Sequence, residues 1–197
     1  MVTTDTNLGD LYAGAVTTWT GRVADVPPDA WDAQTPCAAW SVRDLVNHVV
    51  GEDRWTVPLV NGSSPAEVGD AFAGDLLGED PTVAVTQSAA AALAVVREHL
   101  PSGGAVRLSY GEEDLGEYVR QLAADHLLHA WDLAVATGGD RELDPALVAE
   151  VAAWFADREE VYRQAGAIGP RVDAGGDPQS DLLAASGRDP AWTPPPR

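Results

Sequence analysis

A long apolar stripe with the period of an α-helix is the feature that most constrains how this chain can fold. Its members are Val42, Leu45, Val46, Val49 and Val50. Apolar residues at i, i+3, i+4, i+7 and i+8 lie on one face of a helix, which must be buried against other elements. Ser41 and Asp44 precede the stripe as a capping box, with Asp in place of the usual Glu. We therefore predict a helix that begins after Ser41 and ends near Pro58.

Further helical segments are separated by stretches rich in glycine and proline. The predicted helices cover residues 8–23, 82–100, 116–137 and 144–164, with a short helix at 181–185. Residues 61–81 are expected to be mostly loop with one short helical turn, and residues 105–115 to form a short extended segment or hairpin. So many helices with so little strand predict an all-α helical bundle. We expect a single domain over residues 1–192, with an irregular C-terminal tail that is frayed at 193–197.

Charge and cysteine content exclude several classes of function. The 197 residues include 31 acidic and 12 basic side chains, for a net charge of −19. Nucleic acid and anionic membrane surfaces require clustered Lys and Arg, so we expect neither as a partner. One cysteine excludes an internal disulfide and a cysteine-cage zinc site. The first ten residues lack the pattern of a signal peptide, and no apolar run approaches the roughly 20 residues of a membrane span, so we expect a cytoplasmic protein.

The placement of the few histidines is the most informative chemical feature. In the predicted helix after Ser41, His48 and Glu52 form a stripe along the border of the apolar face. In the predicted helix 116–137, Asp125 and His129 are i, i+4 neighbours, so both side chains can reach one point. Imidazoles that point into a bundle from two helices can converge on a metal. Two nitrogens and one carboxylate oxygen suit a catalytic divalent cation with one position open to water or thiolate.

Each of these residues also has an alternative interpretation. A histidine on an apolar helix face is commonly a hydrogen-bonded core residue, and His126 could replace Asp125 as a ligand, support the ligands from behind, or simply pack. Cys37 lies near a helix N-terminus, where a thiol can become reactive. Because no histidine is near it in sequence, we expect Cys37 to pack as a small apolar residue. Trp55, on the His48 stripe, is predicted to line a pocket, and Arg54 to hold an anionic substrate group or to form a surface ion pair.

Three blocks of the sequence resemble a known family over about residues 8–192. They are TPCAAWSVRDLVNHVVG, ADHLLHAWDLAVATG and GPRVDAGGDPQSDLLAASGRDPAW. These blocks are similar to those of the mycothiol-dependent maleylpyruvate isomerase-like family of actinobacteria, a branch of the DinB/YfiT-like metal-binding superfamily. The resemblance implies a DinB-like antiparallel four-helix bundle that holds a divalent metal, zinc or nickel, at one end of its core.

The resemblance also assigns roles to residues. The first histidine ligand of the family matches His48, and its acid-x-x-x-His pair matches Asp125 and His129, with Asp where the isomerase branch usually has Glu. His126 matches no family ligand, so it stands behind the ligands or in the core. Members with known activity handle low-molecular-weight thiols, which implies a mycothiol-like cosubstrate and a small electrophile. The isomerase has a second, C-terminal domain for which this sequence leaves no room, so maleylpyruvate isomerisation itself is not expected.

Two hypotheses of different classes follow. In the first, the protein is a metal-dependent transferase or isomerase that uses a thiol. Water or thiol fills the open position, and Glu52 orients His48 or accepts a proton. In the second, it is a non-catalytic metal-binding bundle that serves as a binding or regulatory module, with the metal enclosed by a fourth protein ligand such as His126. The number of protein ligands distinguishes the two. An apolar helix face also allows a homodimer.

Overall fold

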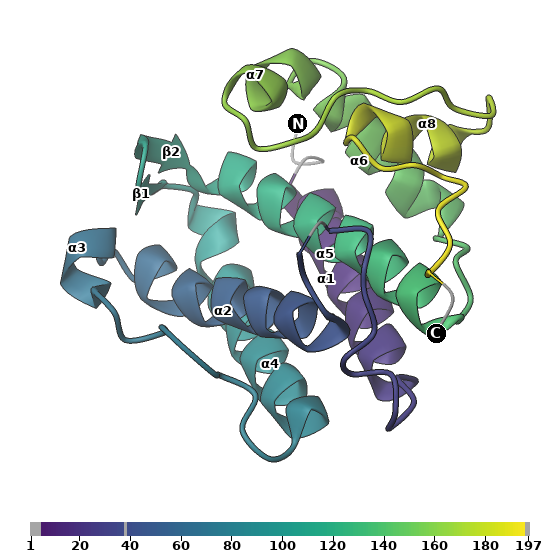
Figure 1. Cartoon of the computed structure of the whole chain (residues 1–197). Helices are drawn as coiled ribbons and strands as arrows, with labels where there is room; N and C mark the ends of the chain where they lie inside the picture. Colours follow the sequence, from purple (N-terminus) through teal and green to yellow (C-terminus); the bar gives the residue numbers. More distant parts are fainter. Residues whose placement is uncertain (1–4, 38, 196–197) are drawn as a thin grey trace.

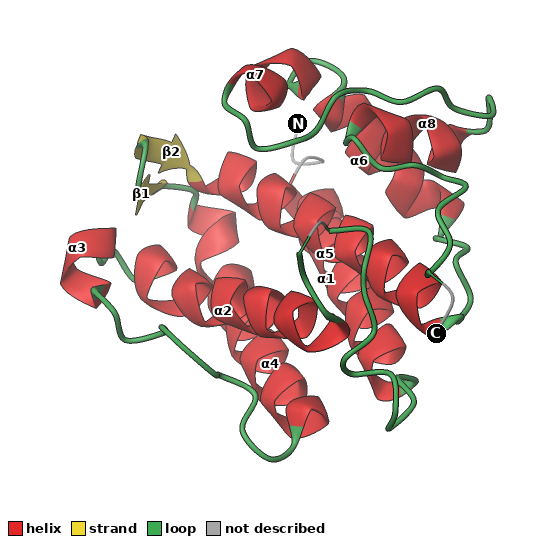
Figure 2. Cartoon of the chain, viewed as in Figure 1, coloured by secondary structure: helices red, strands yellow, loops and turns green. Residues whose placement is uncertain are grey.

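The computed structural model describes residues 5–37 and 39–195, and it confirms the predicted all-α class (Figure 2). Residues 196–197 of the tail expected to fray lie outside the described residues. Four long helices form the body of the molecule: α1 (Asp5–Ala24), α2 (Val42–Val60), α4 (Pro81–His99) and α5 (Leu115–Thr137). α1 packs against α5 and α4, and α2 packs against the same two helices (Figure 1). No helix in the described part of the chain is both long and apolar enough to cross a membrane.

Shorter helices and strands lie at the two ends of this bundle. They are α3 (Pro65–Val68), a 3-10 turn η1 (Leu100–Ser102), β1 (Ala105–Leu108), β2 (Gly111–Asp114), α6 (Pro145–Phe155), α7 (Glu159–Gln164) and α8 (Pro178–Ala185). The predicted hairpin over 105–115 is confirmed, because β1 and β2 pair antiparallel with Ala105 opposite Asp114. α8 begins three residues before the predicted start, since Asp177 accepts a hydrogen bond from the Ser180 amide and caps the first turn.

Two predicted helices differ in extent from those of the structure. α2 continues past Pro58, because Leu59 and Val60 are buried and their burial favours the last helical turn despite the missing proline amide. The predicted helix 144–164 is broken into α6 and α7. The break lies at Arg158, whose guanidinium pairs with Glu117 at the start of α5 and lies over the Trp154 ring. These tertiary contacts redirect the chain where the local pattern predicts a continuous helix.

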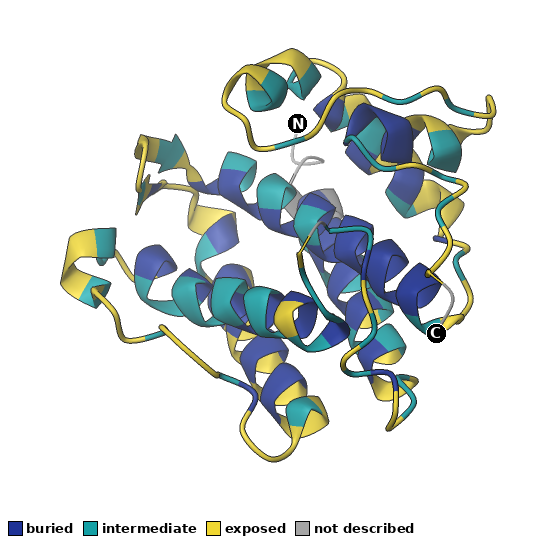
Figure 3. Cartoon of the chain, in the orientation of Figure 1, coloured by how far each residue is buried: buried dark blue, intermediate teal, exposed yellow. Residues whose placement is uncertain are grey.

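α5 is the central helix of the fold. Every residue from 126 to 136 is buried (Figure 3). Three polar side chains, His126, His129 and Asp132, lie within this buried stretch. Polar groups that leave water require hydrogen-bond partners, so the partners of these three residues decide what the helix can do.

The capping box of α2 provides a first prediction. The Ser41 hydroxyl accepts from the Asp44 amide at 3.2 Å, and the Asp44 carboxylate accepts from the Ser41 amide at 3.0 Å. Ser41→Ala should lower the free energy of unfolding by about 1 kcal/mol, as measured by chemical denaturation. Ser64 makes the same reciprocal bonds with Glu67 in α3, whose residues are exposed or half-buried. Ser64→Ala should therefore cost clearly less, and equal losses would contradict the assignment of α2 as part of the cooperative core.

Candidate functional site

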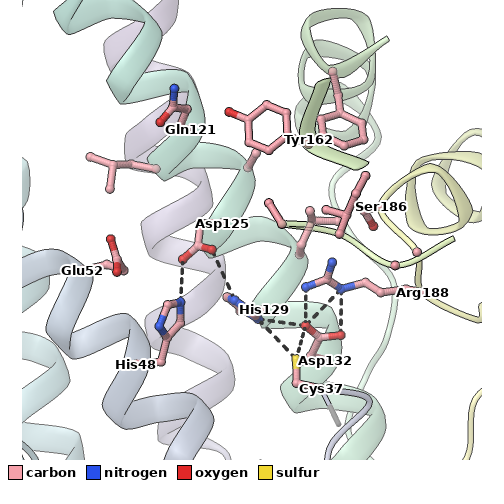
Figure 4. A pocket seen from close by; sticks show the side chains of 18 of the residues that line it. Cys37, His48, Glu52, Gln121, Asp125, His129, Asp132, Tyr162, Ser186 and Arg188 are labelled. Atoms are coloured by element: carbon pink, nitrogen blue, oxygen red, sulfur yellow. Dashed lines mark hydrogen bonds and ion pairs between the residues drawn. The ribbon is translucent and has the colours of Figure 1, made fainter. Parts of the chain in front are cut away.

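The structure brings together the three side chains that the sequence selects as metal ligands. His48 comes from α2, and Asp125 and His129 come from successive turns of α5 (Figure 4). His129 Nε2 lies 3.3 Å from Asp125 Oδ1, and His48 Nε2 lies 3.7 Å from Asp125 Oδ2. One ligand atom from each residue lies within 4.8 Å of the other two. This spacing lets all three atoms face one point between the helices.

The donor set fits a divalent cation. Asp125 Oδ2 is buried and has no hydrogen-bond partner, because the 3.7 Å separation from His48 Nε2 is too long for a hydrogen bond. Burial alone would raise the pKa of Asp125, but the adjacent His129 and His48 imidazoles hold it well below its usual value. A buried carboxylate oxygen without a partner, flanked by two imidazole nitrogens, is a site that favours a bound positive charge.

Asp132 and Arg188 fix the orientation of His129. Asp132 Oδ2 lies 2.9 Å from His129 Nδ1, and Arg188 Nη2 donates to the same oxygen at 2.7 Å. Burial raises the pKa of Asp132, but the Arg188 guanidinium and His129 lower it to about 2, so Asp132 is ionised. His129 Nδ1 therefore carries a proton and donates a hydrogen bond to Asp132. Nε2 points toward Asp125, and it offers a lone pair to a cation that displaces its proton.

Cys37 lies beside this hydrogen-bonded pair. Its Sγ is 3.4 Å from Asp132 Oδ2 and 3.9 Å from His129 Nδ1. Cys37, His129 and Asp132 thus form a second group with metal-ligand spacing. Arg188 already neutralises Asp132, and the proton on His129 Nδ1 faces this group, so the side with His48 and Asp125 is the better metal position. Cys37 was expected to pack as a small apolar residue because no histidine is near it in sequence, but the fold brings the distant His129 and Asp132 to its Sγ.

His126 belongs to the core and not to the ligand set. Its Nδ1 donates to the Leu122 carbonyl oxygen at 2.8 Å, and its Nε2 lies 3.1 Å from Asp53 Oδ1. The Ser88 hydroxyl donates to the other oxygen of Asp53 at 3.1 Å. Both ring nitrogens of His126 are therefore occupied. The group ties α5 to α2 and α4 in the interior behind the candidate metal centre.

The remaining predicted residues divide between the cavity and the surface of α2. Glu52 lines the cavity, and burial followed by the Asp125 charge raises the pKa of its carboxyl. Trp55 packs against Phe72 with ring centroids 5.8 Å apart, and Arg54 donates to the Leu76 carbonyl. The structure brings neither Trp55 nor Arg54 to the cavity wall.

Trp40 is an aromatic residue of the cavity lining that the sequence patterns did not identify as a site residue. Its ring centroid lies 4.9 Å from that of His48 and 6.2 Å from that of His129. Trp40 lies in the loop that enters α2, one residue before the capping Ser41. Its proximity to the predicted start of the His48 helix is the signal that could have identified it.

A cavity of about 720 Å³ opens beside the three candidate ligands. Its lining comes from four places: the loop around Cys37 and Trp40, one face of α2 and α5, the turn region of α6 and α7, and the segment that ends at Arg188 (Figure 4). This volume lies within the range of small-molecule sites. The arrangement can therefore place a small substrate directly against a cation at the ligand set.

The hydrogen bond between His129 and Asp132 provides a second prediction. Asp132→Asn keeps the shape of the side chain but allows an amide N–H to face His129 Nδ1, which favours the tautomer whose Nε2 carries the proton. The zinc affinity should fall by about 10- to 100-fold, as measured by competition with a chromophoric chelator. Asp140→Asn is the matched control, because Asp140 pairs with Arg22 outside the cavity. An Asp132→Asn affinity equal to that of the control would show that Asp132 does not act through His129.

Comparison with known proteins gives one family and two relatives. Residues 12–134 match the model described as the mycothiol maleylpyruvate isomerase N-terminal domain. Two Mycobacterium tuberculosis proteins, uncharacterized protein MT0763 (strain CDC 1551 / Oshkosh) and uncharacterized protein Rv0738 (strain ATCC 25618 / H37Rv), are each 34% identical over 137 residues. The match covers 65% of this chain and 66% of each relative. No solved structure matches the chain significantly.

Proposed function

The chain belongs to the mycothiol maleylpyruvate isomerase N-terminal domain family, and from this premise we propose that it is a metal-dependent, thiol-using enzyme. In this proposal His48, Asp125 and His129 hold a divalent cation, zinc or nickel. The cosubstrate is a low-molecular-weight thiol such as mycothiol, and the second substrate is a small electrophile. The reaction is a transfer or an isomerisation.

The observation that carries the proposal is the unpartnered Asp125 oxygen beside two imidazoles at the edge of a cavity. A cation held by three protein ligands keeps a position open to a substrate, whereas structural zinc sites are closed by four. A divalent cation at such a site supplies Lewis acidity, which lowers the pKa of a coordinated thiol or water toward neutrality. The competing hypothesis of a closed structural site requires a fourth ligand, and both nitrogens of His126 are already hydrogen-bonded.

The chain's own residues would perform the remaining tasks. Asp132 and Arg188 hold the His129 ring so that Nε2 faces the site. Glu52, whose carboxyl has a raised pKa, lines the same cavity and is placed to accept the thiol proton. Trp40 packs on His48 and keeps its ring from rotating away.

The proposed reaction, whether a transfer or an isomerisation, accounts for each bond that forms or breaks. In a transfer, the thiol sulfur forms a bond to the electrophilic carbon, a leaving group departs with its electron pair, and the thiol proton passes to Glu52 or to solvent. In an isomerisation, the sulfur adds to one carbon of a cis double bond, the resulting single bond rotates, and the sulfur leaves as the double bond re-forms. The thiol is regenerated in the second form and consumed in the first.

Titration of the cobalt-substituted protein with mycothiol tests this proposal. Binding of the thiol sulfur should add a thiolate-to-cobalt charge-transfer band that saturates near one equivalent. S-methyl mycothiol, which has no free thiol, is the matched control and should give no such band. Absence of the band with mycothiol, or the same spectrum with both compounds, would contradict thiol use at this site.

Glu52 gives a separate prediction for the chemical step. Glu52→Gln removes the proton acceptor but keeps the size of the side chain. The rate of the reaction, followed as mycothiol consumption for a transfer or as product isomer for an isomerisation, should fall by about 100-fold, while zinc content stays at the parent value. An unchanged rate would remove Glu52 from the mechanism without affecting the ligand assignment.

A further inference from the structure

One side of the cavity is a wall of apolar and aromatic side chains that come from the C-terminal part of the chain. Phe155 ends α6, Tyr162 lies in α7, and Ile168 lies in the following loop. Trp154 adds a third ring beside them. All four residues lie beyond residues 12–134, the part matched by the family model. The family match therefore assigns no ligand to this wall.

The wall is held in place before any ligand arrives. Phe155 and Tyr162 have ring centroids 5.8 Å apart, and Trp154 and Tyr162 have centroids 6.2 Å apart. The Trp154 indole N–H donates to Glu117 at 3.0 Å, and Arg158 donates to the same carboxylate at 2.8 Å. These bonds tie the aromatic cluster to the first turn of α5. A preorganised apolar surface loses little entropy when it binds a ligand.

The aromatic wall itself offers no positive charge to an anionic occupant. Glu52, Asp125 and Asp132 contribute carboxylates to the lining. Among the described residues that line the cavity, Arg188 is the one guanidinium or ammonium group, and it already donates three hydrogen bonds to Asp132. Burial raises the pKa of Tyr162 to about 12, so its phenol stays neutral near pH 7. A dicarboxylate would meet no free cation of the protein on this wall.

The two ends of the cavity also differ in polarity. Glu52 lines the side toward α2, where a polar, sugar-bearing thiol can find a hydrogen bond, whereas Tyr162 lies toward the C-terminal segment (Figure 4). We propose that the aromatic wall is the binding site for the electrophile, and that this electrophile is a neutral molecule with a flat aromatic body. Stacked and edge-on ring contacts are what such a wall provides. The identity of the occupant as the electrophile rests on the proposed thiol chemistry, but its binding does not.

A fluorescence titration with N-phenyl-1-naphthylamine tests the inference, because this neutral aromatic probe brightens in an apolar site. The parent protein should bind it saturably at one site, with or without zinc. Tyr162→Ala should weaken binding about tenfold through loss of a ring contact. Val161→Ala is the matched control on the same short helix, since Val161 is 65% exposed, and it should stay within twofold of the parent. Thermal melts of both variants establish that they remain folded.

Three outcomes would overturn the inference. They are absence of saturable probe binding, equal weakening by Val161→Ala, and displacement of the probe by maleate, a dicarboxylate that contains no ring. Failure of the proposed function has a different signature. A parent that binds the probe but takes up no zinc would refute the metal chemistry and leave the wall intact. Zinc uptake without probe binding would refute the wall alone.

Discussion

His129→Ala is expected to lower the zinc affinity by more than 100-fold. The substitution removes one of the three proposed protein ligands, whereas loss of a group that only supports a ligand typically costs 10- to 100-fold. His129 also contacts both Asp125 and Asp132, so its loss removes both of these contacts. The measurement is a competition titration with a chromophoric chelator on metal-free protein.

His99→Ala is the matched control for this experiment. It removes an imidazole that lies at the C-terminal end of α4 and does not line the cavity. Its zinc affinity should equal that of the parent. Circular dichroism should show that both variants keep their helices, because neither imidazole belongs to the apolar core that holds the bundle together. Parent-like affinity in His129→Ala would exclude this residue as a ligand.

Asp53→Ala should lower the free energy of unfolding by about 3–5 kcal/mol at neutral pH, the typical cost of removing one partner of a buried charged pair. Asp53 and His126 both have fully buried side chains, with Nε2 and Oδ1 3.1 Å apart. The substitution leaves His126 without a counter-charge and Ser88 without its carboxylate acceptor. Ser88→Ala removes only a hydrogen bond and should cost about 1 kcal/mol. Equal losses from the two substitutions would contradict a charged pair.

The pH dependence gives this prediction a second readout. Burial lowers the pKa of His126, but the Asp53 carboxylate raises it above the ordinary value of 6.5. A raised pKa in the folded state stabilises the protein fully below the unfolded value and loses that contribution as the pH rises through the folded value. The stability difference between the parent and Asp53→Ala should therefore shrink as the pH is raised. A difference that stays constant with pH would show that His126 is neutral in the fold.

The local elements of the fold were readable from the sequence because their signals lie within a few residues. The stripe from Val42 to Val50 and the Ser41–Asp44 capping box identify α2, and the hairpin follows from short alternating segments. The i, i+4 spacing of Asp125 and His129 requires only that α5 be a helix. Each of these inferences depends on helix or strand geometry and not on the tertiary fold.

The parts that were not predicted depend on contacts between distant residues. Cys37 and His129 are 92 residues apart in sequence, and Arg188 and Asp132 are 56 apart, so no local pattern connects them. The break between α6 and α7 likewise reflects the pairing of Arg158 with Glu117, 41 residues earlier. A helical stripe assigns a side chain to a face but does not say what covers that face. Trp55 shares the stripe of His48, yet Phe72 from the following loop packs against it.

The metal content of the protein, purified without an affinity tag or added metal, tests the central claim most directly. Elemental analysis should find about one equivalent of zinc or nickel per chain in the parent as purified. Metal-free parent should take up the same amount when either ion is added. The His48→Ala and Asp125→Ala variants, measured beside it, should hold little of either metal. A parent that binds neither ion, or variants that retain a full equivalent, would contradict a metal centre formed by His48, Asp125 and His129.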